Sequence, residues 1–528
     1  MRLIRRLLLT VIPGLALALL CVGAIHAQSD ANVAHAATGA PTPAVNVFTS
    51  GPQAVVTQPI PSLPLYVPNQ FISTGSLDEQ GRLGSFMKGR YGGDVIRGQR
   101  IDLRFFTGIS GTLFFSPNQL PTLFAYVYTV REGSGLVLED VVTELNNNVA
   151  FSQMLIEFNL LIANPWSIAG SPWSIAGSPV TTPTLGANPE MYWSQFNHLS
   201  EYGMGPLAGG GAPYSYTGEG VNIAIFDTSP YDQPVLQHRF QFFGGIPVSV
   251  THVLSDPLTS DGLDPSPVHI PGHGLFVAGL ARAVAPKANI VLYKVLDDTG
   301  RGRESDLLAA LSLYSQTLVA TPTVINLSFG VAPSVEITQL ETLSNVLHGL
   351  HFLGNTIVAA AGNNSSLTDT KPMLYPAAFD FVVGVAAGNS EGHRSCYSNS
   401  AISAASGKRG IAAPGGQGDT TGGGCVPPSD LSHVNCPGDP LCMMTSWWDP
   451  LNAPHYTLGA GTSFAAPIVS GAAALTRQMK GPATSAYSVN QYLYDHAQLR
   501  ESSLGYGTLN FLNMFLPART YMPLLVRD

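Results

Sequence analysis

Charged side chains are scarce in this sequence. The 528 residues include 25 Lys and Arg and 34 Asp and Glu, so only 11% are charged and the formal net charge is −9. An average soluble domain has about 25% charged residues. Lys and Arg form no stripe, and their one cluster stands at the very start of the chain. Because phosphate binding requires a basic surface, this composition argues against nucleic acid as a partner.

Cysteine is also rare, with five residues. Cys21 lies near the start, and the other four are Cys396, Cys425, Cys436 and Cys442. An even number in an exported chain is compatible with two disulfides in any of three connectivities, and free buried thiols are the alternative. The spacings contain no C-x₂-C pair, which argues against a zinc site.

Long apolar runs are confined to the N-terminus. Arg2, Arg5 and Arg6 precede an apolar run over 7–24, and the small residue Ala27 follows. This pattern predicts a signal peptide over residues 1–27, with a retained anchor as the alternative. No later segment is apolar for long enough to cross a membrane. We therefore expect a secreted or envelope-associated protein with no stable membrane span after signal removal.

Turn-forming residues are abundant, with 55 Gly and 40 Pro, and they help to divide the first third of the chain. Residues 28–80 are predicted to be a low-complexity linker rich in Ala, Pro, Thr, Val and Ser. Residues 81–164 are predicted to form a small α+β unit, with strands over 101–106, 123–128 and 154–161 and a helix over 138–151. Residues 165–192 contain PWSIAGS twice. We interpret them as a duplicated linker, with a Trp-bearing docking segment as the alternative.

Residues 193–516 have a different pattern, in which apolar strands alternate with helices. This alternation predicts an α/β fold with a doubly wound, mostly parallel sheet covered by helices on both faces. Ligands of such sheets bind at the carboxyl ends of the strands. Residues 415–455 interrupt the pattern as a cysteine-containing insertion. Residues 517–528 are a short apolar tail, interpreted as a retention or sorting signal or as the end of a strand.

Three polar residues stand at the ends of these elements. Asp227 ends the strand over 221–226, His273 opens a helix, and Ser463 begins a helix after a run of glycines. Each alone is compatible with a structural role, as a cap or as a buried histidine. Together, in the order Asp, His, Ser on one α/β sheet, they predict a site of nucleophilic catalysis.

These segments resemble those of the subtilisin-like serine proteases, the subtilases. The stretch GTSFAAP over 461–467 is highly specific to that family. The family usually has Thr and His where this chain has Leu275 and Phe276, and Gly where it has Ser229. The resemblance covers Trp193 to Leu516, about three-fifths of the chain, and implies the subtilisin-like fold.

The resemblance implies a catalytic triad. Ser463 attacks the peptide carbonyl, His273 transfers the proton, and Asp227 orients the imidazole. Asn363, which ends the strand-like segment over 357–363, supplies an oxyanion-hole donor, and the amide of Ser463 supplies another. No metal or organic cofactor is required for this chemistry. Related enzymes often carry structural calcium, but no calcium site is located in the sequence.

The resemblance also places a substrate pocket. The resemblance implies that two segments form the walls of the pocket and that one residue, which precedes a Tyr-Pro pair, forms its floor. The wall residues are Ser328, Phe329, Gly330, Ala360, Ala361 and Gly362, and the floor residue is Leu374. No acidic residue is among them. We expect a preference for apolar residues before the cut, of modest size because Leu374 makes the pocket shallow.

The function predicted overall is that of an exported serine endopeptidase that hydrolyses polypeptides and is made as an inactive precursor. Residues 81–164 are interpreted as a propeptide that assists folding and acts as an intramolecular inhibitor, with an unrelated accessory domain as the alternative. A catalytically inactive surface protein that binds peptides is the rival function. A lipase or esterase has little support, because Ser463 stands in GTSFA and not in a G-x-S-x-G elbow.

Overall fold

The computed structural model describes a set of segments separated by gaps: residues 65–103, 123–163, 216–229, 238–239, 247–252, 273–297, 299–316, 323–389, 392–416, 445–447, 456–458, 461–481 and 483–515. The predicted signal peptide, the PWSIAGS repeat and the C-terminal tail lie outside these residues. No helix among the described residues is both long enough and apolar enough to cross a membrane.

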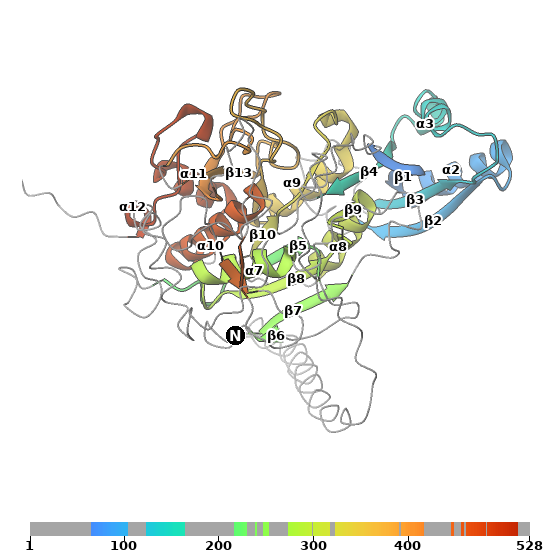
Figure 1. Ribbon diagram of the computed structural model, residues 1–528. Helices are drawn as coiled ribbons and strands as arrows, with labels where there is room; N and C mark the ends of the chain where they lie inside the picture. Colours follow the sequence, from blue (N-terminus) through green and yellow to red (C-terminus); the bar gives the residue numbers. More distant parts are fainter. Residues whose placement is uncertain are drawn as a thin grey trace, which may run out of the picture. The chain divides into compact units, whose positions relative to one another are not determined.

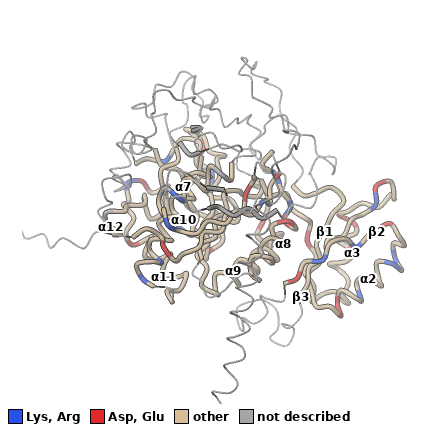
Figure 2. Tube along the Cα trace, turned by 90° about the horizontal axis from the view of Figure 1, so that it is seen from below, with Lys and Arg blue, Asp and Glu red and all other residues tan. Residues whose placement is uncertain are grey.

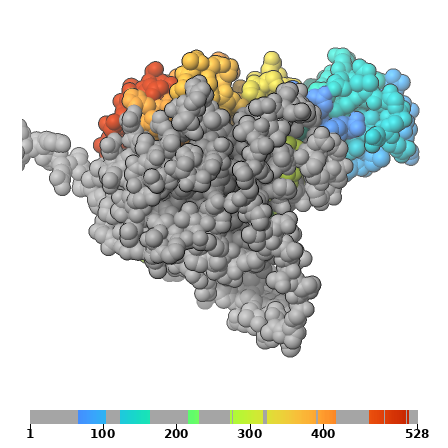
Figure 3. Space-filling model, viewed as in Figure 1, coloured from blue at the N-terminus to red at the C-terminus, as the bar shows by residue number. Residues whose placement is uncertain are grey.

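The N-terminal unit is a small α+β structure, as predicted (Figure 1). Its antiparallel strands follow the order β4-β1-β3-β2. A hydrophobic core formed by Phe71, Tyr128 and Leu145, among others, joins the sheet to two helices. The side chains of this unit form a continuous body, coloured blue to cyan in Figure 3. Its elements are β1 (Tyr66–Ser76), α2 (Leu77–Tyr91), β2 (Val95–Asp102), β3 (Leu123–Val130), α3 (Leu138–Asn146), η3 (Val149–Phe151) and β4 (Leu155–Ala163).

The structure corrects two sequence boundaries in this unit. The linker was predicted to extend to residue 80, but β1 lies inside it and is a central strand between β3 and β4. Pro68 and Asn69 interrupt the strand pattern there, and the φ of Asn69 is +60°. The sequence around them therefore does not predict a strand. The strand predicted over 101–106 is β2, which begins earlier, at Val95.

The second part of the chain contains an eight-stranded sheet, in the order β14-β13-β12-β10-β5-β8-β7-β6. All neighbouring strands are parallel except the pair β7 and β6. This confirms the doubly wound, mostly parallel sheet. The strands are β5 (Asn222–Asp227), β6 (His238–Arg239), β7 (Pro247–His252), β8 (Asn289–Lys294), β10 (Thr323–Leu327), β12 (Thr356–Ala360), β13 (Val383–Gly388) and β14 (Ile411–Pro414).

Helices cover both faces of this sheet (Figure 1). Ile223 and Ile225 of β5 pack into the cluster that contains α7 and α10, whereas Ala224 and Phe226 pack into the cluster that contains α8 and α9. Alternate side chains of a strand point to opposite faces, so the continuous apolar run of β5 fits a strand buried on both sides. The helices are α7 (His273–Val284), α8 (Glu304–Gln316), α9 (Glu341–Phe352), α10 (Thr462–Lys480), α11 (Ala486–Asp495) and α12 (Phe511–Phe515).

Shorter elements fill the connections. The short helix η5 (Ile337–Gln339) precedes α9. Within the predicted insertion, β15 (Thr445–Trp447) pairs with β16 (Tyr456–Leu458), which lies just beyond it. Cys396 is disulfide-bonded, and the other cysteines lie outside the described residues. Acidic and basic positions are interspersed along the described chain (Figure 2). The remaining elements are β9 (Arg301–Arg303), β11 (Gly330–Val331) and η7 (Ser502–Leu504).

Candidate active site

Asp227 and His273 form a buried pair at the carboxyl end of β5. His273 Nδ1 lies 2.8 Å from Asp227 Oδ1, and neither side chain is exposed. The backbone N–H of Thr228 donates to the same carboxylate oxygen at 2.7 Å. Both contacts are made to Oδ1, and an N–H at His273 Nδ1 leaves Nε2 as the imidazole's proton acceptor.

A glycine allows helix α7 to approach β5 this closely. A Cβ on Gly274 would lie 2.2 Å from the carbonyl oxygen of Thr228, which no side chain tolerates. The backbone N–H of Gly274 donates a hydrogen bond to Thr228 Oγ1 at 3.1 Å. The Gly that follows His273 in the sequence is thus required for the His–Asp distance.

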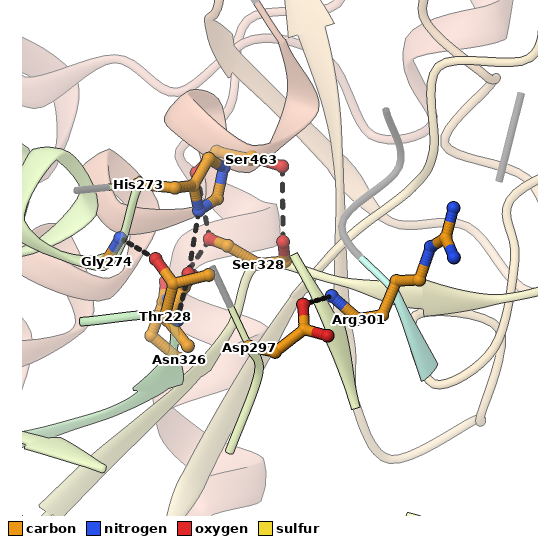
Figure 4. A network of polar contacts seen from close by, with 9 residues as sticks. Thr228, His273, Gly274, Asp297, Arg301, Asn326, Ser328 and Ser463 are labelled. Atoms are coloured by element: carbon orange, nitrogen blue, oxygen red, sulfur yellow. Dashed lines mark hydrogen bonds and ion pairs between the residues drawn. The ribbon is translucent and has the colours of Figure 1, made fainter. Parts of the chain in front are cut away.

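Ser463 is the second residue of α10, after Gly461 at the N-cap. Figure 4 shows its side chain beside the His273 ring. Its hydroxyl donates to the carbonyl oxygen of Ser328 at 3.2 Å. His273 Nε2 is buried and has no hydrogen-bond partner among the described residues. The imidazole therefore has a free acceptor next to a serine whose hydroxyl is engaged elsewhere.

Asn363 is oriented by its neighbour in space, Thr462. The backbone N–H and the hydroxyl of Thr462 both donate to Asn363 Oδ1, at 3.0 and 2.9 Å. This fixes the amide so that Nδ2 points away, and that buried nitrogen has no partner among the described residues. A free, aligned N–H₂ near the helix N-terminus that bears Ser463 is suited to hold a developing oxyanion.

Aromatic rings fill the space behind the histidine. The Phe276 and Phe464 ring centroids are 4.2 Å apart, and the Phe464 ring lies 5.3 Å from the His273 ring. Phe276, the larger residue at one of the positions where the sequence departs from its relatives, is therefore accommodated in the core. It does not displace His273 from Asp227.

A comparison with known families matches residues 218–512 to the model described as the subtilase family. This match spans more than half of the chain. The chain belongs to the subtilase family.

Individual relatives agree with this assignment. Subtilisin BL from Lederbergia lenta is 29% identical over 301 residues, which is 55% of this chain and 88% of that protein. The minor extracellular protease Epr from Bacillus subtilis (strain 168) is 26% identical over 310 residues, 56% of this chain and 38% of that protein. A crystal structure of a cold-adapted subtilisin-like serine proteinase is 22% identical, covering 58% of this chain and 96% of that one, with a TM-score of 0.39. Membership of this family makes the chain a serine endopeptidase with polypeptide substrates.

The predicted pocket residues of this subtilase gather at the carboxyl ends of β10 and β12. Leu374 lies between two glycines: a Cβ on Gly362 would lie 2.9 Å from Leu374 Cδ1, and one on Gly330 would lie 3.4 Å from it. The Leu374 N–H also donates to the carbonyl of Ala361 at 2.9 Å. Ser328 lies beside Ser463. The remaining two, Phe329 and Ala360, are buried in the clusters on opposite faces of the sheet.

Strand β4, the last strand of the N-terminal unit, lies between the short strands β9 and β11 next to the predicted pocket. Strand β4 pairs antiparallel with β9 on one side and with β11 on the other. Ile162 lies opposite Gly302 and Val331, and Ala163 lies opposite Arg301 and Gly330. A segment of the chain's own N-terminal unit thus lies as an extended strand between β9 and β11, and this space between the two strands is called the groove below.

Two polar residues of β4 cap two helices of the catalytic domain. Glu157 accepts hydrogen bonds from the backbone N–H groups of Glu341 and Thr342, at 2.7 and 3.1 Å, and from the Thr342 hydroxyl. Asn159 Oδ1 accepts from the backbone N–H of Ser305 at 3.1 Å. These bonds satisfy N–H groups that the helix starts leave open. The sequence analysis missed both roles, because capping across domains leaves no local signal.

A buried carboxylate stands beside these caps. Glu304, the first residue of α8, is fully buried, and the backbone N–H groups of Leu160 and Leu343 face its carboxyl group. Burial raises its pKa well above the usual value, and the nearby Glu157 carboxylate raises it further. Burial also raises the pKa of Glu157, against the effect of its hydrogen bonds. Burial therefore favours the neutral form of Glu304 more strongly than it would for an exposed carboxyl group.

Among the described residues, no group of three or more His, Cys, Asp or Glu side chains could hold a metal ion. The structural calcium implied by the resemblance therefore stays a prediction without a location.

Proposed function

We propose that this subtilase is an exported endopeptidase that works through the triad Asp227, His273 and Ser463. The observation that carries the proposal is the 2.8 Å contact between His273 Nδ1 and Asp227 Oδ1, which leaves Nε2 free beside Ser463. A binding protein without catalysis has no need for an unpartnered buried nitrogen at this place.

The proposed reaction begins with the Ser463 hydroxyl. Its oxygen attacks the carbonyl carbon of the substrate while its proton passes to His273 Nε2. Asp227 stabilises the imidazolium that forms. The negative oxygen of the tetrahedral intermediate is held by Asn363 Nδ2 and by the backbone N–H of Ser463.

The C–N bond then breaks. His273 gives its proton to the leaving amine, and an ester of Ser463 remains. Water repeats the sequence: its proton passes to His273, its oxygen attacks the ester carbon, and the proton returns to Ser463 as the acid leaves. No metal ion or organic cofactor takes part in this sequence.

The same proposal includes a precursor state. Strand β4 fills the groove between β9 and β11, and Asp227, His273 and Ser463 are fully buried. This supports the N-terminal unit as an intramolecular inhibitor that is removed by cleavage after Ala163. A signal peptide over residues 1–27 and two disulfides are the remaining parts of the proposal, and export is supported by the relative named as an extracellular protease.

The pocket supports a preference for apolar residues before the cut. Leu374 fills the space between Gly330 and Gly362, and no charged side chain stands among the predicted pocket residues. Such a pocket selects small or medium apolar side chains and rejects charged ones, because a buried charge there has no partner.

The test compares the purified full-length protein with its Ser463→Ala variant. We expect the parent to lose a segment that ends beyond Ala163 and to digest casein, while the variant stays intact and inactive. If both proteins lose the segment but only the parent digests casein, another protease performs maturation. If the folded parent never digests casein, the peptide-binding function replaces the proposed one.

A further inference from the structure

The backbone carbonyl of Ser463, the proposed nucleophile, lacks its usual hydrogen-bond donor within helix α10. Pro467 lies inside α10, four residues after Ser463. In an α-helix the N–H of residue i+4 donates to the carbonyl of residue i, and proline has no N–H. The carbonyl oxygen of Ser463 is therefore left without its helical donor at a fully buried position.

The hydroxyl of Ser328 takes the place of that donor. Ser328 Oγ donates to the Ser463 carbonyl oxygen at 2.8 Å, and the Ser463 hydroxyl donates to the Ser328 carbonyl oxygen at 3.2 Å. The two residues thus exchange two hydrogen bonds between the end of β10 and the start of α10 (Figure 4). The first bond holds the backbone of the nucleophile, and the second holds its side chain.

Asn326 directs this hydroxyl. Its Nδ2 donates to Ser328 Oγ at 3.0 Å, so the Ser328 hydrogen is left to point at the Ser463 carbonyl. Its Oδ1 accepts a hydrogen bond from Ser470 Oγ at 2.9 Å. Ser470 lies two helical turns beyond Ser463 on the same side of α10. One side chain of β10 therefore acts on the nucleophile's helix at two points.

We propose that Asn326 and the hydroxyl of Ser328 are positioning residues that hold the backbone of Ser463 for catalysis, in place of the hydrogen bond that Pro467 removes. This inference rests on the proposed function of Ser463. The backbone matters because the N–H of Ser463 is an oxyanion donor and its Cα carries the nucleophile. A displacement of about 1 Å in such a group lowers the rate about 10²-fold.

The proposal is tested with a double-mutant cycle of Ser328→Ala and Pro467→Ala. Ser328→Ala leaves the Ser463 carbonyl without a donor, and we expect kcat to fall about three- to tenfold with KM unchanged, the range of one net hydrogen bond. Pro467→Ala supplies a backbone N–H to the same carbonyl. In that background, Ser328→Ala should lower kcat less than about twofold. Equal losses in both backgrounds would overturn the proposal.

A second cycle keeps the proposal testable if Pro467→Ala does not fold. Asn326→Ala should lower kcat at least as much as Ser328→Ala, because it also removes the Ser470 hydrogen bond. The double variant should lose no more than Asn326→Ala alone, because Ser328 acts on Ser463 through the hydroxyl that Asn326 directs. Multiplying losses would show separate roles. The rate of inactivation by a fluorophosphonate, which reacts with Ser463 without using the substrate pocket, should fall in parallel with kcat.

The matched control is Thr476→Val in the same helix. Thr476 Oγ donates to the Ala472 carbonyl at 2.8 Å and is buried. We expect this variant to lower the unfolding temperature without changing kcat. If kcat falls with the unfolding temperature in all the variants alike, the network is structural and the inference fails. Failure of the proposed function is distinct, because the parent itself would then show no activity to compare.

Discussion

Glu304 gives the full-length protein a stability that falls as the pH rises. Burial and the Glu157 carboxylate raise its pKa well above the usual value, and the backbone N–H groups of Leu160 and Leu343 oppose part of this rise. Between the unfolded pKa and the raised folded pKa, the folded protein therefore binds a proton that the unfolded chain has released. This contribution to stability is complete below the unfolded pKa of about 4.3 and is lost as the pH rises through the folded pKa.

The magnitude is set by linkage. One carboxyl group that is protonated in the folded state and ionised in the unfolded state lowers the unfolding free energy by about 1.4 kcal/mol for each pH unit. Glu157, whose pKa is also raised, adds a slope of the same sign, and the charge of Glu341 favours its protonated form. Next to Glu304 in the sequence, Arg303 of β9 and Asp306 of α8 form an ion pair of 3.3 Å.

The assay is urea unfolding of the full-length Ser463→Ala variant, which lacks the proposed nucleophile, at a series of pH values from 4 to 8. We expect the unfolding free energy to fall with rising pH, and Glu304→Gln to remove the part of that slope due to one group. Glu132→Gln, which changes an exposed carboxylate in the turn after β3, is the control and should leave the slope unchanged. Identical slopes for the parent and Glu304→Gln would refute a protonated Glu304.

Further predictions concern the site and its support. Asp227→Asn should lower kcat about 10⁴-fold with an unchanged circular dichroism spectrum, and a small loss would remove Asp227 from the triad. Asn363→Ala should lower kcat about 10²–10³-fold at constant KM, whereas a change in KM alone would indicate a role in substrate binding. Lys408, whose ammonium donates to the carbonyls of Ala377, Phe379 and Val382, fills a ring of backbone oxygens. Lys408→Met should therefore lower the unfolding free energy, measured with urea, by about 3 kcal/mol. An unchanged unfolding free energy would contradict a stabilising role for these hydrogen bonds. Leu374→Ala should raise kcat/KM for peptides with Phe before the cut relative to Ala by roughly tenfold, and an unchanged ratio would place the pocket elsewhere.

The parallel sheet and the candidate triad could be predicted from the sequence because their signals are local. β5 reads as a buried strand from its apolar run alone, and Asp227 and Ser463 stand at element ends where polar residues are conspicuous. The Gly after His273 marks the close approach of α7 to Thr228 that the site requires. Local signals thus sufficed wherever a residue's role depended on its own strand or helix.

The rest depended on partners far away in the sequence. β9 consists of Arg-Gly-Arg, which no strand propensity favours, and it exists because β4 pairs with it. In the sequence Thr462 stands out only as part of the GTSFAAP motif, and its hydrogen bond to Asn363 joins residues 99 positions apart. The helix caps supplied by Glu157 and Asn159 likewise connect the two domains. Neither residue lies next to the helix that it caps in the sequence, so no local pattern predicts its role.

Strand β4 links the groove to the helix starts through a single element. Glu157 and Asn159 are two positions apart and cap α9 and α8, while Ile162 and Ala163 pair with both edges of the groove. Departure of β4 would therefore open the groove and uncap both helices together. Glu304 would then face water at the first position of α8, where a helix N-terminus favours a negative charge. The Glu304 carboxyl group favours its neutral form when β4 is in place and its ionised form when β4 is absent, so we expect rising pH to favour release of the N-terminal unit.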